Sequence, residues 1–286
     1  MSLKAIEIFH DLEEKDFQFL SELEEAGSRY KWIPNDKLTE FSDMPRQDID
    51  YRLDRLNKFE LVEKGLKKYR GYRILPPGYD VMAIHSLVEE DILEAFGIAY
   101  GIGKEADIYS GLTPDEKKVA VKFNRIGLSF KKVKEKRSYQ PEHGWFDASK
   151  EAARKEFNGL RKVHPEVEVP EPIAFDRHVL IMGLIEGEEL AKVKKIDQPE
   201  MVLDEIIRNV KVTYKEGVIH GDLSEHNIMV KPNGEILIID WPQWKSVKEE
   251  NSYELLKRDV ENILKFFERK FQIDRDLKQV LETIKV

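Results

Sequence analysis

The chain has 286 residues, of which 41% are hydrophobic and 36% charged, which is enough for one large domain or two modest ones. The absence of Cys excludes disulfides, thiol nucleophiles and zinc–thiolate sites, and the net charge of -8 argues against nonspecific coating of nucleic acid, although a local basic patch remains compatible with it. The N-terminus is too charged for a signal peptide, and no apolar run approaches the ~20 residues of a membrane span. We therefore expect a cytoplasmic protein with no membrane partner.

Residues 1–75 predict a winged helix-turn-helix. Short helices are expected at 16–27, 34–42 and 43–60, because apolar residues recur at helical spacing and Gly, Pro and Asp mark the ends. Residues 61–75 have the pattern of two strands joined by a Lys-rich turn. Three helices followed by a basic hairpin are typical of this fold.

A connecting helix is predicted at 78–92, after which the pattern changes to strands. We place the boundary near residue 90, with a winged-helix domain and its linker helix at 1–90 and a second domain at 91–286. The second domain is expected to contain strands at 94–103, 106–112 and 117–125, a cation-rich loop at 126–144, a helix at 149–163, strands at 172–176 and 178–184, a helix at 199–217, a strand at 235–240 and two closing helices.

The winged-helix segment is locally basic. Residues 44–73 hold nine cations and five acids, a balance of +4 inside an acidic chain. We expect phosphate contacts from the third helix and the hairpin turn. A solvated surface that binds nothing is the alternative. The candidate nucleic-acid residues are Arg46, Arg52, Arg55, Lys67, Lys68 and Arg70.

Two features of the second domain point to a phosphate. The stretch GIGKEADIYSG at 101–111 lies between two strands, and glycines let backbone N–H groups approach a phosphate, although a plain hairpin turn explains it equally well. Lys122 stands in the apolar strand VAVKFNR, where its ammonium must meet an anion or reach solvent. Together they favour a nucleotide phosphate, with Glu156 on the next helix orienting Lys122 and Glu151 as the weaker candidate.

The stretch HGDLSEHN at 220–227 lies between two apolar segments. Asp222 can accept a hydroxyl proton or orient an attacking oxygen, and Asn227 can bind a metal through its amide oxygen. Asp240 ends the strand ILIID and can bind the same metal–nucleotide complex. A polar turn with a capping Asn is the alternative, but it does not explain why these residues follow a strand Lys and a helix Glu in this order.

This order resembles the protein kinase fold: Gly loop, strand Lys, helix Glu, H-x-D-L-x-x-x-N and a metal-binding Asp. The metal Asp stands in IDWPQ, and too few residues follow Asp240 for an activation loop and peptide-binding helices. The chain is similar to the RIO-type atypical serine kinases, specifically an archaeal-like member of their second subfamily, which carries a winged helix. The resemblance implies an α+β fold with a winged helix-turn-helix domain before a trimmed two-lobed kinase domain, its N-lobe at about 91–182 and its C-lobe at about 186–286.

The resemblance also implies roles for single residues. Asp222 would be the catalytic aspartate, Lys122 would contact the nucleotide phosphates and pair with Glu156, and Asn227 and Asp240 would hold Mg²⁺ (or Mn²⁺) with ATP.

The remaining implied contacts belong to the nucleotide. Met182 would lie behind the adenine as gatekeeper, and the backbones of Gly183 and Ile185 would bond its edge. The phosphate loop would be shaped by Gly101, Gly103, Lys104, Glu105 and Ser110.

Members of this family autophosphorylate on Ser, use ATP hydrolysis and act in maturation of the small ribosomal subunit. The resemblance therefore implies a serine/threonine kinase with ATPase activity, whose partners are the rRNA and proteins of the subunit precursor. Ser129 is the expected autophosphorylation site and Ser138 the second choice. Structured RNA is the expected ligand of the winged helix, with duplex DNA as the alternative.

Two other functions remain open at this point. One is a small-molecule phosphotransferase of the aminoglycoside or choline type, which shares the HGD and Asn but normally has a large helical region after the metal Asp. The other is a winged-helix DNA-binding regulator whose second domain only senses nucleotide. That regulator would be expected to lack Lys122, Asp222, Asn227 or Asp240, and all four are present.

Overall fold

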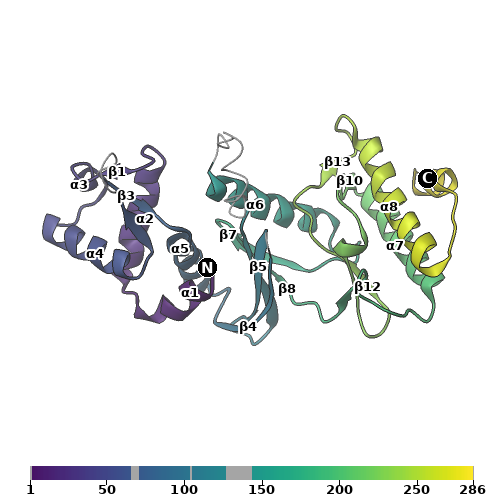
Figure 1. The fold of residues 1–286 in the computed structure, drawn as a ribbon, viewed down its shortest axis with the longest axis horizontal. Coiled ribbons are helices and arrows are strands. Elements are labelled where there is room, and N and C mark those ends of the chain that lie inside the picture. The colour runs from purple at the N-terminus through teal and green to yellow at the C-terminus, as the bar shows by residue number, and fades with distance from the viewer. Residues whose placement is uncertain (1, 66–70, 104, 127–143, 286) are drawn as a thin grey trace.

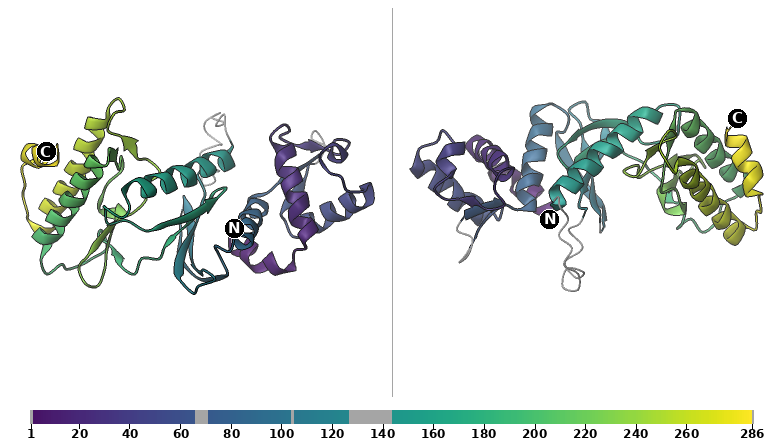
Figure 2. Two further views of the ribbon diagram at one scale, coloured as in Figure 1. Left: turned by 180° about the vertical axis from the view of Figure 1, so that it is seen from behind. Right: turned by 90° about the horizontal axis from the view of Figure 1, so that it is seen from above.

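The structure is a computed structural model that describes residues 2–65, 71–103, 105–126 and 144–285. Its parts follow one another along the long axis, with the N-terminal domain at one end, a central sheet, and a helical part that contains the C-terminus (Figure 1). The views from behind and from above show the same row of three parts (Figure 2). No helix among the described residues is both long and apolar enough to cross a membrane.

The N-terminal domain has the predicted winged helix-turn-helix fold. Its sheet has the order β1-β3-β2, with Ile33 opposite Tyr72 and Val62 opposite Ile74. The elements are α1 (Ser2–Ile8), the 3-10 helix η1 (Phe9–Asp11), α2 (Glu14–Gly27), β1 (Ile33–Pro34), α3 (Leu38–Phe41), α4 (Arg46–Lys58), β2 (Val62–Lys64), β3 (Gly71–Ile74) and α5 (Pro76–Glu89).

Three details of this domain differ from the sequence prediction. Helix α1 was not predicted, and the expected second helix at 34–42 is reduced to α3, because Pro34 ends the short strand β1 and residues 35–37 form a turn. Asp43 does not cap α4; Pro45 occupies the N-cap position, with no side-chain hydrogen bond. Proline is well suited to a helix start, since its fixed φ is compatible with entry and it lacks the N–H that would be unpaired there.

The central part is the N-lobe, an antiparallel sheet of the order β4-β5-β6-β8-β7. Helix α6 packs along it, against β6, β7 and β8. The strands are β4 (Ala95–Ile102), β5 (Ala106–Leu112), β6 (Lys118–Asn124), β7 (Pro172–Asp176) and β8 (Val179–Gly183), and the helix is α6 (Trp145–Val163).

The hydrophobic core continues from the winged helix into the N-lobe. The predicted boundary at 88–92 falls between α5 and β4. Yet Met82 and Ile84 of α5 belong to the same buried cluster as Val121 and Phe123 of β6. The two domains are therefore separate in sequence and topology but share one apolar interior.

The C-lobe forms around the second core, in which Trp241 and Phe267 are fully buried. Two small sheets, β12-β11-β9 and β10-β13, lie beside its helices. Its elements are β9 (Glu188–Glu189), α7 (Pro199–Lys215), β10 (Val218–Ile219), the 3-10 helix η3 (Glu225–Asn227), β11 (Ile228–Val230), β12 (Ile236–Ile238), β13 (Lys245–Ser246), α8 (Ser252–Phe271) and α9 (Leu277–Lys285).

Candidate active site

A hairpin brings the two predicted metal residues together. Strands β11 and β12 pair antiparallel with Ile228 opposite Ile238, and the N–H of Ile239 donates to the carbonyl of Asn227 at 3.0 Å. Asn227 and Asp240 therefore stand at the same end of the hairpin, although thirteen positions separate them in the sequence. Asp240 has φ 66°, in the left-handed region that is uncommon for residues other than Gly and that occurs often at functional sites.

Lys122 forms the centre of a buried ion-pair cluster. Its Nζ lies 2.8 and 2.7 Å from the two carboxylate oxygens of Glu156 and 2.7 Å from Oδ1 of Asp240. Burial alone would lower the pKa of Lys122, but the two carboxylates outweigh it and hold the pKa above its ordinary value. The lysine is therefore a fixed cation. Glu151 bonds to Arg154 on the surface instead, so Glu156 is the partner, as predicted.

The loop that carries Asp222 is held by its backbone. The carboxylate of Asp259 on α8 accepts the N–H of Gly221 at 2.7 Å and the N–H of Leu223 at 3.1 Å, and the guanidinium of Arg258 donates to the carbonyl of Gly221. Burial raises the pKa of Asp259 to about 6, against the effect of the two N–H groups. These three contacts fix the peptide groups on both sides of Asp222.

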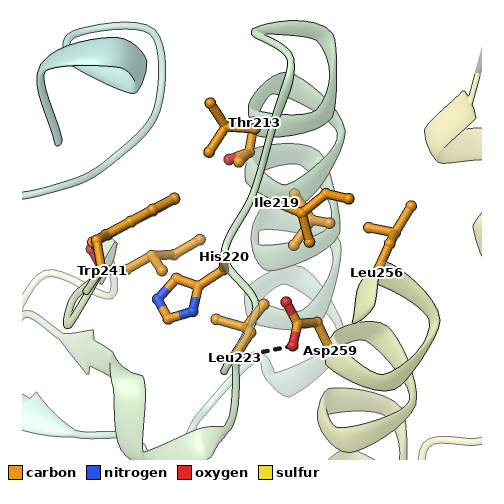
Figure 3. Close-up of a pocket in the computed structure, with 10 residues that line it drawn as sticks. Thr213, Ile219, His220, Leu223, Trp241, Leu256 and Asp259 are labelled. Carbon is orange, nitrogen blue, oxygen red and sulfur yellow. Dashed lines mark hydrogen bonds between the residues drawn. The ribbon is translucent and has the colours of Figure 1, made fainter. Parts of the chain in front are cut away.

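A second support lies behind the same loop, as Figure 3 shows. The ring of His220 packs beside Trp241, with centroids 4.6 Å apart, and its Nε2 lies 3.0 Å from the carbonyl oxygen of Ile239. Burial lowers the pKa of His220 to about 4, so its ring is neutral near pH 7 and donates this hydrogen bond. His220 therefore ties the loop of Asp222 to the residue before Asp240.

The side chains of Asp222 and Asn227 are also oriented. The amide nitrogen of Asn227 donates to the backbone carbonyl of Asp222 at 2.8 Å, which leaves its amide oxygen free for a cation. Oδ2 of Asp222 accepts a hydrogen bond from Gln243 at 2.9 Å. Burial raises the pKa of Asp222, while Arg258 opposes this shift. Each of the two side chains is therefore held by one hydrogen bond within the protein.

The strand that leaves the Gly-rich turn lies next to Lys122 in the sheet, since β5 and β6 pair with Ile108 opposite Lys122. The N–H of Gly103 donates to the carbonyl of Ala106 at 2.8 Å, and the N–H of Arg125 donates to the carbonyl of Glu105 at 2.6 Å. Gly101 lies in β4, which forms the first side of the turn, and Lys104 lies outside the described residues.

Ser110 lies beyond the turn itself, and its role in the phosphate loop stays a prediction. Ser110 lies within β5, opposite Ala120, and its hydroxyl donates to the carbonyl of Ile98 at 3.3 Å. The regular pairing of β5 with β6 continues past the Gly-rich turn, so Ser110 is part of the sheet.

The predicted adenine-binding residues lie where β8 ends and the chain leaves the N-lobe. Met182 is 9% exposed and packs in the core beside Leu180 and Ala120. The N–H of Gly183 is already bonded to the carbonyl of Glu171 at 2.9 Å.

The predicted nucleic-acid face is partly wrong. Arg52 is only 8% exposed, and its guanidinium donates to Glu13 at 2.6 Å and to Asp16 at 2.9 Å. Arg55 also bonds to Asp16, at 2.9 Å. Both arginines face α2 because their guanidinium groups bond to Asp16, which is fully buried there. Neither group is therefore available to a phosphate.

Of the other predicted cations, Arg46 is 40% exposed and pairs with Asp50 at 2.9 Å, while also bonding to Asn35. The remaining predicted residues of this surface, and both candidate phosphorylation sites, lie outside the described residues: Lys67, Lys68, Arg70, Ser129 and Ser138.

Three residues of the site were not predicted: Gln243, Arg258 and Asp259. Gln243 belongs to the IDWPQ stretch, so its proximity to Asp240 could have drawn attention to it. Arg258 and Asp259 lie more than 30 positions beyond Asp222, on a helix that carries many other charges, and no sequence signal separates them from surface residues.

Comparison with known proteins gives two family matches that together span most of the chain. The RIO domain matches residues 107–280, and the N-terminal domain of Rio2 matches residues 9–90. The chain belongs to the RIO family of kinases. It is a serine/threonine-protein kinase with an N-terminal Rio2 domain and a RIO kinase domain, as the sequence predicted. The family assignment sets aside the small-molecule phosphotransferase and the nucleotide-sensing regulator.

Two relatives match most of this chain. The kinase is 39% identical to the RIO-type serine/threonine-protein kinase Rio2 of Methanocaldococcus jannaschii over 259 residues, which are 86% of this chain and 93% of that protein. It is 31% identical to the serine/threonine-protein kinase RIO2 of Caenorhabditis elegans, covering 96% of this chain and 53% of the relative.

A solved structure confirms the fold. The crystal structure of the Rio2 kinase–ADP/Mg²⁺–phosphoaspartate complex from Chaetomium thermophilum matches with a TM-score of 0.84 at 28% identity, covering 97% of this chain and 88% of that chain. ATP and Mg²⁺ are therefore the expected substrate and metal of the kinase.

Proposed function

We propose that the kinase transfers the γ-phosphoryl group of ATP to a serine hydroxyl or to water, with Asp222 as the catalytic aspartate. The observation that carries this proposal is the cluster in which Lys122 contacts both Glu156 and Asp240. The cluster fixes a cation for the phosphates directly beside a carboxylate for the metal. Asp222 is the oriented carboxylate that accepts the proton of the attacking oxygen.

The donor set fits Mg²⁺, which prefers oxygen ligands. Asn227 has its amide nitrogen bonded to the backbone, so its oxygen is free, and Lys122 holds the pKa of Asp240 below its ordinary value despite burial, so Asp240 is a carboxylate at neutral pH. Asn227 and Asp240 would hold the ion, and Mn²⁺ would suit the same ligands. The bound ion would neutralise charge on the phosphate oxygens during transfer.

We further propose that turnover passes through an aspartyl phosphate, by analogy with the phosphoaspartate complex of the Chaetomium thermophilum kinase. A carboxylate oxygen of this chain would attack the γ-phosphorus, the bond to the β–γ bridging oxygen would break, and ADP would leave. Water would then release inorganic phosphate. Asp240 is the better candidate than Asp222, because it already contacts Lys122, the proposed phosphate ligand.

The test is the steady-state rate of inorganic phosphate release, because the proton that Asp222 would accept belongs to the attacking water. Asp222→Asn should slow it by about a hundredfold or more, as for other positioned acid–base groups, while calorimetry shows nearly unchanged ATP affinity. Wild-type turnover in this variant would refute the role of Asp222. For the aspartyl phosphate, ³²P from γ-labelled ATP should be released by hydroxylamine and absent in Asp240→Asn. Protein that carries no hydroxylamine-labile label would refute the covalent step, since label on a serine resists hydroxylamine and does not bear on it.

The biological setting is proposed from the family resemblance. We propose that the kinase acts in maturation of the small ribosomal subunit, that it autophosphorylates on Ser129, and that its partner is the subunit precursor. Among the cations predicted to contact RNA, Arg46 and the hairpin residues Lys67, Lys68 and Arg70 remain candidates. Incubation with Mg²⁺-ATP followed by mass spectrometry tests Ser129, and phosphate found only outside residues 125–140 would contradict it.

A further inference from the structure

Gln243 lies beside the proposed catalytic carboxylate. Its amide nitrogen donates to Oδ2 of Asp222 at 2.9 Å. Among the described residues, no other side chain donates a hydrogen bond to this carboxylate. Asp222 thus has its Oδ2 bonded within the protein, while its Oδ1 is left to accept a hydrogen bond from the attacking hydroxyl or water.

The strand pairing explains why Gln243 reaches Asp222. Strands β10 and β13 are antiparallel, with Val218 opposite Ser246 and Ile219 opposite Lys245. Two further steps along this register place Gly221 opposite Gln243. The backbones are in direct contact there, since a Cβ on Gly221 would lie 2.7 Å from the carbonyl oxygen of Gln243. Gly221 also has φ +80°, so a residue without Cβ is required on both grounds.

The turn that carries Gln243 is anchored at both ends. Trp241 is fully buried, and its indole N–H donates to the carbonyl of Ile238 at 3.0 Å. The indole N–H of Trp244 donates to the carbonyl of Lys155 at 2.7 Å, and its ring lies where a Cβ on Gly159 would be. Gln243 therefore projects from a turn that is fixed both to the C-lobe core and to α6, the helix that carries Glu156.

We infer that Gln243 is a positioning residue for Asp222: it holds Oδ2 so that Oδ1 faces the attacking hydroxyl or water. A neutral amide suits this task, because it orients the carboxylate without lowering its pKa, and with it the affinity for the proton of the attacking oxygen, as a Lys or Arg would. Misplacement of a reacting group by about 1 Å can cost up to ~100-fold in rate, so one such hydrogen bond has a measurable effect. This inference rests on the proposed function of Asp222.

The first test separates orientation from binding. Gln243→Ala should lower kcat for ADP formation by about tenfold while the KM for ATP changes less than about threefold, because the phosphates are held elsewhere. Gln243 is exposed, so the substitution removes no core packing. A thermal melt of each variant confirms that it is folded.

The second test compares two variants that place opposite charges at position 243. The charged groups that face Asp222 are Arg258, Asp259 and Asp240, and they stay in place in both variants. Gln243→Glu adds a like charge beside Asp222 and should move the acid limb of the pH–kcat profile up by about one pH unit. Gln243→Lys should move it down by a similar amount. Gln47→Glu, the same charge change on the exposed face of α4, is the matched control and should leave the limb unchanged.

The outcomes distinguish the inference from the proposed function. If Asp222→Asn is inactive but the Gln243 variants keep the wild-type kcat and acid limb, Gln243 has no positioning role and the proposed function stands. If Asp222→Asn keeps its activity, the proposed function itself fails. A residue that only stabilises the turn would lower the melting temperature in all three Gln243 variants without opposite shifts of the acid limb.

Discussion

Replacing Asp80 by Asn should loosen the joint between the winged helix and the N-lobe. Asp80 lies on α5 and is fully buried, and its two carboxylate oxygens bond to the guanidinium of Arg125 at 2.8 and 2.7 Å. Its Oδ1 also accepts from His178 at 2.7 Å. Burial would raise the pKa of Asp80, but Arg125 and His178 outweigh it and lower the pKa, so the group is ionised when folded.

The expected loss of folding stability follows from the contacts that Arg125 keeps in the variant. In Asp80→Asn, Arg125 keeps a bond to Ser2 at 2.9 Å and a long contact with Asp107 at 3.5 Å, so its charge stays buried and poorly compensated. Removing one partner of a buried ion pair typically costs about 3–5 kcal/mol, and we take ~3 kcal/mol because Asp107 remains. At roughly 2–4 °C per kcal/mol for a protein of this size, the melting temperature should fall by about 6–12 °C.

Scanning calorimetry measures this effect, and a neighbouring pair supplies the control. Arg177 and Glu24 also join the N-lobe to the winged helix, at 2.8 Å, but their side chains are 18% and 25% exposed. Glu24→Gln should cost about 1 kcal/mol or less, because solvent screens this pair. An Asp80→Asn protein that melts within ~2 °C of wild type, or no lower than Glu24→Gln, would show that the buried pair does not hold the domains together.

Glu156→Gln should weaken ATP-dependent turnover by about tenfold or more in kcat/KM, since Lys122 would lose one of its two carboxylates; Glu151→Gln on the same helix is the control and should change nothing. Asp259→Asn should change the pH dependence of folding: with a folded pKa of about 6 and an unfolded pKa of ~3.9, the folded state binds the proton more tightly. Wild-type stability relative to the variant should therefore rise by about 2 kcal/mol as pH falls from 7 to 4, and urea unfolding with no such rise would contradict the burial argument. Arg52→Gln should destabilise the winged helix by about 3 kcal/mol, measured by thermal unfolding, while the RNA affinity of the folded protein stays within about twofold in filter binding.

Two features of the candidate site could be predicted because their chemistry is conspicuous in the sequence. A Lys inside an apolar strand requires a carboxylate or phosphate partner, and Glu156 was the expected one. The spacing of Asn227 and Asp240 fits a strand, a turn and a returning strand, and the β11–β12 hairpin has this form. The hairpin rests on short-range geometry, which a sequence encodes directly. The partner of Lys122 lies 34 positions away and follows instead from the need of a buried ammonium for a carboxylate.

The contacts that support the site could not be predicted in the same way. Asp259 is one of many charged residues on α8, and only the packing of this helix against the loop of Gly221 gives its carboxylate two backbone N–H groups to bind. Gln243 meets Asp222 through the register of two strands of two residues each, β10 and β13, which carry no periodic signal. Such contacts depend on tertiary placement rather than on local pattern.

The error in the predicted nucleic-acid face has a different origin, because the sequence already indicated that Arg52 lies on the buried side of α4. Arg52 stands three residues after Ile49 and four before Leu56, so helical geometry places it on the buried side of α4 with the apolar stripe. Its partner Asp16 sits in the first turn of α2, where it also accepts the N–H of Glu13 at 2.9 Å. A charge count alone treats every arginine as exposed. Because Arg52 and Arg55 bond to Asp16 inside the domain, the centre of α4 offers neither of these two guanidinium groups to a phosphate.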